Sequence, residues 1–303
     1  MSDLRPGDRR IWEGQAQVFS ERIQRRALVW WGKPNKWRRA ATYRHLLHTF
    51  KENNTLRDRN DPDRRWRCCA LWQRTLSNKW NSREFAARHG CRVPALYWSG
   101  RRIGTLPIRS LPEHFVIRPI WGDSHRNVRV IADDTDLFTG KRYPRDHLAH
   151  QLRRTIGRIV RFPIMVEEFV RTESGAYELP IDYKCHMFGD VVGAIEVVHR
   201  PHYPGKAAHR CYSASWEPFD DCFNTTLPQS GVCDPPKCLD EILAYARRLG
   251  AAYGTYVRVD CYASDRGCVF GEFSSTPTAG RNFTPYADEY FEALWRETFP
   301  ERT

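Results

Sequence analysis

The sequence predicts an α+β protein whose sheets are mostly antiparallel, and three observations support this class. Strand-like segments occur in pairs joined by short turns, as in residues 256–273. Helix-like segments with apolar residues at helical spacing lie between those pairs, as in residues 239–249. The chain has 303 residues, of which 41% are hydrophobic, so it can bury a sizeable core divided over two or three subdomains.

The individual elements follow from local signals along the chain. Ser77 is the expected N-cap of a helix, and Gly90 stands where a helix-terminating glycine belongs. Apolar residues at helical spacing predict further helices, and short apolar runs bounded by turns predict hairpins. In chain order we expect strands at 93–97, 114–118 and 128–131, a helix at 146–160, a strand at 164–170, a hairpin at 181–188 and 191–198, a helix at 239–249, strands at 256–262 and 268–273, and a final helix around 290–295.

The net charge of +12 is unevenly distributed. Residues 1–110 hold 25 Lys and Arg against 9 Asp and Glu, whereas the remainder holds 23 against 27. A basic first third would face nucleic acid, an anionic membrane surface or an acidic substrate, or would simply be a solubilising surface. Tryptophans stand among the arginines of residues 1–75, where they would stack on bases or pack on half-buried helix faces. Nucleic-acid binding through residues 1–75 is therefore one open alternative.

Several function classes lack their motifs. No apolar run approaches the roughly 20 residues that span a bilayer, and no signal-peptide pattern precedes the first helix, so we expect a cytoplasmic location without stable membrane insertion. The ten cysteines lack the spacing of a zinc site, and the eleven histidines are interpreted as polar surface. GxxxxGK[ST], GxGxxG, HExxH and GxSxG are all absent. Phosphates, if bound, must be held by basic side chains and a hairpin loop.

Two carboxylates near the C-terminus form the most informative pattern. Asp260 lies in one apolar strand segment, and Glu272 lies in the next, beyond a short turn. Cross-strand neighbours place their Cβ atoms about 5 Å apart, so the two carboxylates can share a face. They would repel each other unless a cation lies between them, and magnesium favours such a pair together with substrate phosphates. In the alternative interpretation, each carboxylate pairs with a basic residue, of which Arg258 is the obvious candidate.

Four further motifs precede this acidic pair in a fixed order. They are Ser77-Asn-Lys79, Phe115-Val-Ile-Arg-Pro119, Val166-Glu-Glu-Phe-Val170 and Asp182-Tyr-Lys184. Together they resemble the ATP-grasp superfamily over about residues 77–283. Within it, the chain is most similar to the TupA-like branch, which is linked to teichuronopeptide and cell-surface polysaccharide biosynthesis.

The resemblance implies a nucleotide site built from separate segments. The residues implied to contact the ATP phosphates are Lys79, Arg118 in place of the usual lysine, and Gly122 and Ser124 of the glycine loop. The adenine edge would be read by the segment Glu167, Glu168, Phe169 and Val170, and the ribose hydroxyls by Asp182. The residues implied for catalysis are Lys184, Arg200 and Arg258.

The resemblance also implies magnesium ligands and a reaction. One or two Mg²⁺ ions would be held by Asp260, Glu272 and Ser274, the last standing where the family commonly has Asn. The implied fold has two antiparallel-sheet subdomains flanking ATP. A basic, largely helical region would cover residues 1–104, a central lid residues 105–170, and a C-terminal subdomain with the metal site residues 171–303.

The implied activity is ATP-dependent ligation of a carboxylate substrate to an amine substrate through an acyl phosphate, with an acidic cell-surface glycan or peptide precursor as one reactant. Phosphoryl transfer needs positioning and spread positive charge rather than a nucleophilic side chain, and no nucleophile motif stands out. The alternatives are an ATP-grasp kinase, a non-catalytic nucleotide-binding module and the nucleic-acid binder described above.

Overall fold

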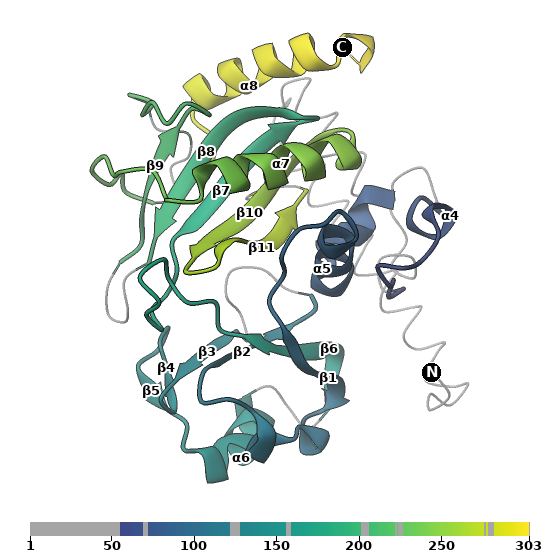
Figure 1. The fold of residues 1–303 in the computed structure, drawn as a ribbon, viewed down its shortest axis with the longest axis vertical. Coiled ribbons are helices and arrows are strands. Elements are labelled where there is room, and N and C mark those ends of the chain that lie inside the picture. Colours follow the sequence, from purple (N-terminus) through teal and green to yellow (C-terminus); the bar gives the residue numbers. More distant parts are fainter. Residues whose placement is uncertain are drawn as a thin grey trace, which may run out of the picture.

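The computed structural model describes residues 55–68, 72–121, 128–155, 159–200, 206–221, 223, 227–275, 277 and 282–302. Its strands form two antiparallel sheets, and helices pack on both (Figure 1). This is the α+β arrangement that the sequence predicts. Gly122 and Ser124 lie outside the described residues, as do residues 1–54 of the basic N-terminal region.

The six-stranded sheet lies in the lower half of Figure 1, with the strand order β1-β6-β2-β3-β4-β5. Its strands are β1 (Leu96–Arg102), β2 (Phe115–Pro119), β3 (Arg129–Ala132), β4 (Thr135–Asp136), β5 (Lys141–Arg142) and β6 (Ile159–Glu168). Helix α6 (Arg145–Thr155) packs beneath it, burying Leu148 and Leu152 against Phe115 and Val166. The apolar stripe of α6 thus meets the apolar face of the sheet, as an amphipathic helix requires.

The five-stranded sheet has the order β11-β10-β7-β8-β9, so β10 is hydrogen-bonded on both sides. Its strands are β7 (Asp182–Phe188), β8 (Val191–His199), β9 (Ala208–Tyr212), β10 (Tyr256–Ser264) and β11 (Gly267–Ser274). Successive strand residues point to opposite faces. On β7, Cys185 and Met187 therefore join one core, while Phe188 joins a separate core on the other face.

Two helices cover the two faces of this sheet. Helix α7 (Leu239–Tyr253) packs on the first core, and α8 (Pro285–Thr298) lies along the top of the view in Figure 1 and packs Phe291 and Trp295 against Phe188. Gly250 permits the close approach of α7 to the β7–β8 turn, because an added Cβ would lie 2.1 Å from the carbonyl oxygen of Gly189. Helix α8 covers only part of its face. The remaining part carries the polar residues described below.

Helix α5 (Lys79–Arg88) follows the short 3-10 helix η2 (Trp72–Ser77), and both pack beside β11 (Figure 1). Phe85 of α5 lies in the α7 core, where its ring contacts Trp72 and Phe273. The N-cap of α5 is Asn78 rather than Ser77, since the Asn78 side chain accepts a hydrogen bond from the Trp80 amide. The hydroxyl of Ser77 instead lies 3.1 Å from that of Ser275.

Two other differences from the expected elements have physical reasons. The expected helix at 146–160 is too long, because α6 ends at Thr155 and residues from Ile159 onward belong to β6, which pairs with both β1 and β2. Strand β9 was not expected, since its buried His209 interrupts the apolar alternation; the side chain bonds to Glu196 instead.

No helix within the described part of the chain has the length and apolar composition needed to cross a membrane.

Candidate functional site

A charged patch occupies the part of the five-stranded sheet that α8 leaves uncovered. Strand alternation puts Asp182 and Lys184 of β7 on one face, and the same rule puts Arg258 and Asp260 of β10 on one face. The strand register then brings these pairs together, because Asp260 lies opposite Lys184 on one side and opposite Glu272 of β11 on the other. All five residues were predicted site residues.

A β-bulge at Gly271 creates the Asp260–Glu272 pair. Asp260 pairs with Glu272 and Cys261 pairs with Phe270, so Gly271 is an extra residue on β11. Regular pairing counted from the Ser264–Gly267 turn would set Glu272 opposite Val259, whose side chain lies in the α7 core. A one-residue shift moves a side chain to the other face of a sheet. The bulge therefore brings Glu272 to the face that carries Asp260.

Asp260 is buried and held by two cations. Lys184 Nζ lies 2.7 Å from Oδ2, and Arg258 donates from Nε to Oδ1 at 2.7 Å and from a terminal nitrogen to Oδ2 at 2.7 Å. Arg258 also donates to Ser274 Oγ at 3.1 Å. Burial lowers the pKa of Arg258, but the charge of Asp260 outweighs this effect and the net shift is upward. The guanidinium thus remains charged.

Glu272 has a different partner and more exposure. Its Oε2 lies 2.8 Å from Lys79 Nζ, at the start of α5. Its side chain is 31% exposed, compared with 3% for Asp260. Burial would raise the pKa of Glu272, but Lys79, Lys184 and Arg118 outweigh burial and hold the pKa well below its ordinary value. Glu272 is therefore a carboxylate that faces solvent on one side.

Asp182 extends the network along β7 and β8. Its Oδ2 is ion-paired with Arg200 and lies 3.3 Å from Lys184 Nζ. Burial lowers the pKa of Arg200. Lys184 thus lies between two carboxylates, Asp182 and Asp260, and links them. The structure joins Lys184, Arg200, Arg258, Asp182, Asp260 and Ser274 in one network, with the Lys79–Glu272 pair directly beside it.

Arg118 comes from the other sheet, on β2. Its Nε donates to Glu167 Oε2 of β6 at 2.6 Å, and Arg83 lies 3.2 Å from the other oxygen of Glu167. Burial lowers the pKa of Arg118, but the Glu167 charge outweighs it and the net shift is upward. Burial raises the pKa of Tyr262 to about 12, with opposing effects from Arg118 and Glu272. Arg118 is thus close enough to act electrostatically on residues of the five-stranded sheet.

The remaining members of the expected adenine segment lie where β6 leads into the linker to β7. The Glu168 amide donates to the Ala95 carbonyl oxygen at 2.8 Å, and its carboxylate is ion-paired with Arg266. Phe169 and Val170 are buried. None of these three side chains contacts the network around Asp260, among the contacts between described residues.

Asp260, Glu272 and Ser274 supply the oxygen donors that magnesium prefers. Glu272 Oε1 makes no hydrogen bond among the described residues, so it could accept a cation, whereas both oxygens of Asp260 are already taken by Lys184 and Arg258. No cluster of three or more His, Cys, Asp or Glu side chains suited to a metal occurs in the described ranges. The donor set thus fits magnesium only if Asp260 releases part of its present pairing.

A buried polar network behind Arg258 was missed by the sequence analysis. His186 Nδ1 lies 2.8 Å from the Tyr256 hydroxyl, and Glu196 lies 2.9 Å from His209 Nδ1 and 3.8 Å from His186 Nε2. The interpretation of the histidines as polar surface is wrong for these two, which are 2% and 1% exposed. The available signal was the alternation on β7, which puts His186 on the face of Asp182 and Lys184.

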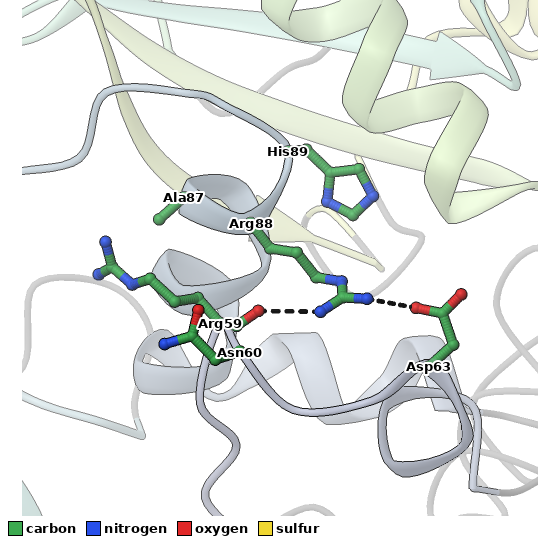
Figure 2. A pocket seen from close by; sticks show the side chains of 6 residues that line it. All are labelled: Arg59, Asn60, Asp63, Ala87, Arg88 and His89. Atoms are coloured by element: carbon green, nitrogen blue, oxygen red, sulfur yellow. Dashed lines mark hydrogen bonds and ion pairs between the residues drawn. The ribbon is translucent and has the colours of Figure 1, made fainter.

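A pocket of about 670 Å³ lies at the end of α5 opposite Lys79. Figure 2 shows the Arg88 guanidinium between the Asp63 carboxylate and the carbonyl oxygen of Arg59. Arg59 is itself paired with Glu84 at 2.8 Å. The basic side chains of this pocket are thus satisfied within the protein, and none of the predicted site residues lines it.

Comparisons with known proteins bear on the fold and the family. A family model described as TupA-like ATPgrasp matches residues 72–295. A search of curated proteins gives no match. Among solved structures, D-alanine–D-alanine ligase from Bacillus anthracis complexed with ATP is 13% identical, with a TM-score of 0.46 over 77% of this chain and 68% of that one.

Two further solved structures are similar at the same level. The ATP-grasp ligase PsnB complexed with a minimal precursor is 13% identical, with a TM-score of 0.41 over 76% of this chain and 63% of that one. D-Alanine–D-alanine ligase from Helicobacter pylori is 13% identical, with a TM-score of 0.45 over 76% and 62%. The chain thus spans less than two thirds of the length of these two proteins.

Proposed function

Because this chain belongs to the TupA-like ATP-grasp family, we propose that it is an ATP-dependent carboxylate–amine ligase that works through an acyl phosphate. The observation that carries the proposal is the meeting of Lys79, Lys184, Arg200 and Arg258 around the carboxylates of one sheet face. These residues come from separate segments of the chain. Such a concentration of fixed cations suits a triphosphate, whose transfer is catalysed mainly by positioning and charge.

In the proposed reaction, a carboxylate oxygen of the acid attacks the γ-phosphorus of ATP and ADP leaves. The amine nitrogen then attacks the acyl carbon, phosphate leaves, and the nitrogen loses a proton. Lys184 and Arg200 would offset the charge of the transferring group, and Arg118 would approach it from the other sheet. Lysine provides a point charge, whereas arginine offers a planar fork for two phosphate oxygens.

Four further assignments belong to the same proposal. The backbone of Glu167–Val170 would read the adenine edge. Asp182 would accept a ribose hydroxyl through Oδ1, the oxygen without a hydrogen bond among the described residues, while Oδ2 stays with Arg200 and Lys184. Magnesium bound by Asp260, Glu272 and Ser274 would neutralise phosphate charge and orient the phosphates. A uronic acid or acidic peptide of a cell-surface glycan precursor is the acid that we propose.

The test uses hydroxylamine as a general amine. Purified full-length protein is incubated with ATP, magnesium and a panel of carboxylic acids, and hydroxamate and ADP are quantified. We expect hydroxamate only with ATP and one class of acid. Glu272→Gln should abolish it, whereas Glu289→Gln, an exposed control on α8, should not. ADP release without any hydroxamate or amide over the whole panel would contradict the ligase assignment.

One observation favours a second candidate, a nucleotide-binding module without turnover. Asp260 and Glu272, the two carboxylates proposed to hold magnesium, are both ion-paired with protein cations. A protein that never binds magnesium would keep these pairs permanently. Calorimetric titration with ATP distinguishes the candidates, because the ligase should bind ATP far more tightly with magnesium present, while the module should bind it equally well in EDTA.

A further inference from the structure

Arg74 of η2 differs from the cations of the network because it has no acidic partner in the part of the chain that the structure describes. One terminal nitrogen donates to Ser275 Oγ at 3.0 Å, and no carboxylate of the described residues lies within ion-pairing distance. Lys79, Lys184, Arg118, Arg200 and Arg258 are each paired with a carboxylate. Most guanidinium donors of Arg74 thus lack an acceptor within the described ranges.

The surroundings of Arg74 make this isolation costly. The residue is half-buried, and burial lowers the pKa of its guanidinium. Removing a charge from water without a counter-charge costs free energy, so buried cations are normally paired. A site that keeps such a cation unpaired is set up to receive an anion, since the ligand then supplies the missing charge.

Two hydroxyl groups lie beside Arg74 and complete an anion-binding arrangement. Ser275 Oγ accepts from Arg74 and lies 3.1 Å from Ser77 Oγ, so both hydroxyls are grouped at one point. A guanidinium binds carboxylate or phosphate oxygens in pairs, and a hydroxyl adds a further donor. The chemistry of the three side chains therefore matches a carboxylate or a phosphate.

This group lies next to the candidate site. Ser275 follows Ser274, which accepts from Arg258, and it comes three residues after Glu272. At about 3.3 Å per strand residue, the Cα atoms of Glu272 and Ser275 are about 10 Å apart. Lys79, the partner of Glu272, is likewise five residues after Arg74. One molecule of moderate length could therefore reach both places.

We propose that Arg74, Ser77 and Ser275 form an anion subsite that binds a second acidic group of the substrate, so that the substrate carries two negative groups. The inference rests on the proposed ligase function for the identity of the ligand. It predicts that dianionic acids are preferred over monoanionic acids of the same length. Arg74 would bind the group that does not react.

The first arm of the test measures anion binding without turnover. Protein saturated with a non-hydrolysable ATP analogue and magnesium is titrated with glutarate, butyrate or inorganic phosphate at constant ionic strength, following the unfolding midpoint. We expect glutarate to raise the midpoint at lower concentration than butyrate. Arg74→Gln should weaken glutarate binding at least tenfold and Arg74→Lys less. Arg64→Gln, an exposed arginine in the preceding segment, should leave it unchanged.

Further measurements distinguish a bound substrate acid from released phosphate. They also test the anion subsite separately from the proposed ligase function. If phosphate binds as tightly as glutarate, and does so through Arg74, the subsite holds released phosphate and the substrate assignment is overturned. Glu272→Gln should retain glutarate binding, so loss of turnover alone leaves this inference standing. Equal glutarate affinity in folded wild type and Arg74→Gln would refute it. If Arg74→Gln does not fold, Ser275→Ala is compared with wild type instead. We expect its glutarate affinity to fall severalfold.

Discussion

Lys79 Nζ lies 2.8 Å from Glu272 Oε2, and this pair joins the first residue of α5 to a strand almost two hundred residues later. Phe273, next to Glu272, donates its amide to Ser82 of α5 at 3.1 Å, so the helix and the strand are also tied at a second point. The pair places a cation where the proposed triphosphate would bind. It also neutralises Glu272 while no metal is present.

Replacing Lys79 by Ala should impair nucleotide binding more than folding. The variant removes one cation from the phosphate region, and Glu272 remains stabilised by Lys184 and Arg118. We expect kcat/KM for ATP to fall by about 10- to 100-fold, as for loss of one charge-assisted contact of about 1.5–3 kcal/mol. Lys237→Ala, at an exposed position, serves as the control. An unchanged kcat/KM in Lys79→Ala would show that Lys79 does not bind the ATP phosphates.

Gly271→Ala should destabilise the bulge that aligns the two acidic residues. The added Cβ would lie 3.0 Å from the Tyr262 ring and 3.1 Å from the Asp260 carbonyl oxygen. Both neighbours are buried or fixed by strand pairing, so we expect a loss of about 1–3 kcal/mol in the free energy of unfolding, measured with urea. Gly175→Ala tests whether any glycine loss has this effect, although its positive φ of 81° adds strain of its own.

Deleting Gly271 should have a different consequence from substituting it. Without the extra residue, regular pairing counted from the turn would still set Glu272 opposite Asp260 and Phe273 opposite Val259, so both carboxylates would stay on one face of the sheet. We therefore expect hydroxamate formation to persist in a deletion variant whose secondary structure, measured by circular dichroism, is retained. Loss of hydroxamate formation in such a folded variant would show that the bulge does more than align Glu272 with Asp260.

Glu167→Gln should strongly destabilise the protein. Glu167 is 2% exposed and its two oxygens face Arg118 and Arg83, so the change leaves buried Arg118 without its carboxylate, whereas Arg83 keeps Glu84 at 2.7 Å. Breaking such a buried arrangement costs about 3–5 kcal/mol. Urea denaturation measures the free energy of unfolding. For Glu178→Gln, at an exposed site, this free energy should lie within about 0.5 kcal/mol of the wild-type value.

His186 should make stability depend on pH. Burial lowers its pKa below 6.5, while Glu196 and Asp260 oppose this shift and Arg258 reinforces it. As pH falls through 6.5, the unfolded chain therefore binds a proton that folded His186 does not bind. The free energy of unfolding should fall between pH 7 and 5, by up to about 1.4 kcal/mol per pH unit.

His186→Gln should flatten this dependence, and His150→Gln, at an exposed histidine, should keep it. Urea denaturation at pH 7, 6 and 5 provides the comparison. If wild type and His186→Gln have the same slope, His186 binds as many protons in the folded chain as in the unfolded chain, and burial does not lower its pKa.

Much of this arrangement could be predicted from the sequence because it depends on strand alternation and short turns. Asp182-x-Lys184 and Arg258-x-Asp260 must each share a face, and the turn at 264–267 predicts the hairpin that carries Asp260 and Glu272. The family match over residues 72–295 confirms the resemblance that these motifs suggested. The alternation of side chains along the strands was sufficient to predict these shared faces.

Features that depend on tertiary contacts could not be predicted in the same way. Counting from the turn sets Glu272 opposite Val259, and only the bulge at Gly271 corrects the register. The choice between ion pairs and a metal also depends on Lys79, which reaches Glu272 only after α5 packs beside β11. His186 is buried against Phe291 of α8, and His209 of β9 is buried where it bonds to Glu196 of β8, and these contacts leave no signal in the sequence near either histidine.

The position of β10 between β7 and β11 should protect the backbone amide of Asp260 from solvent exchange longer than that of Lys79. Backbone amides in a strand paired on both sides exchange with solvent only when the sheet opens, whereas the first turn of a helix frays more readily. In deuterium exchange, Asp260 should therefore be among the last residues to become labelled, and Lys79, whose amide donates to the Ile120 carbonyl oxygen at 2.9 Å, should be labelled earlier. Asp260 thus belongs to the interior of the sheet, whereas Glu272 on the edge strand and Lys79 at a helix end lie in parts that open more often.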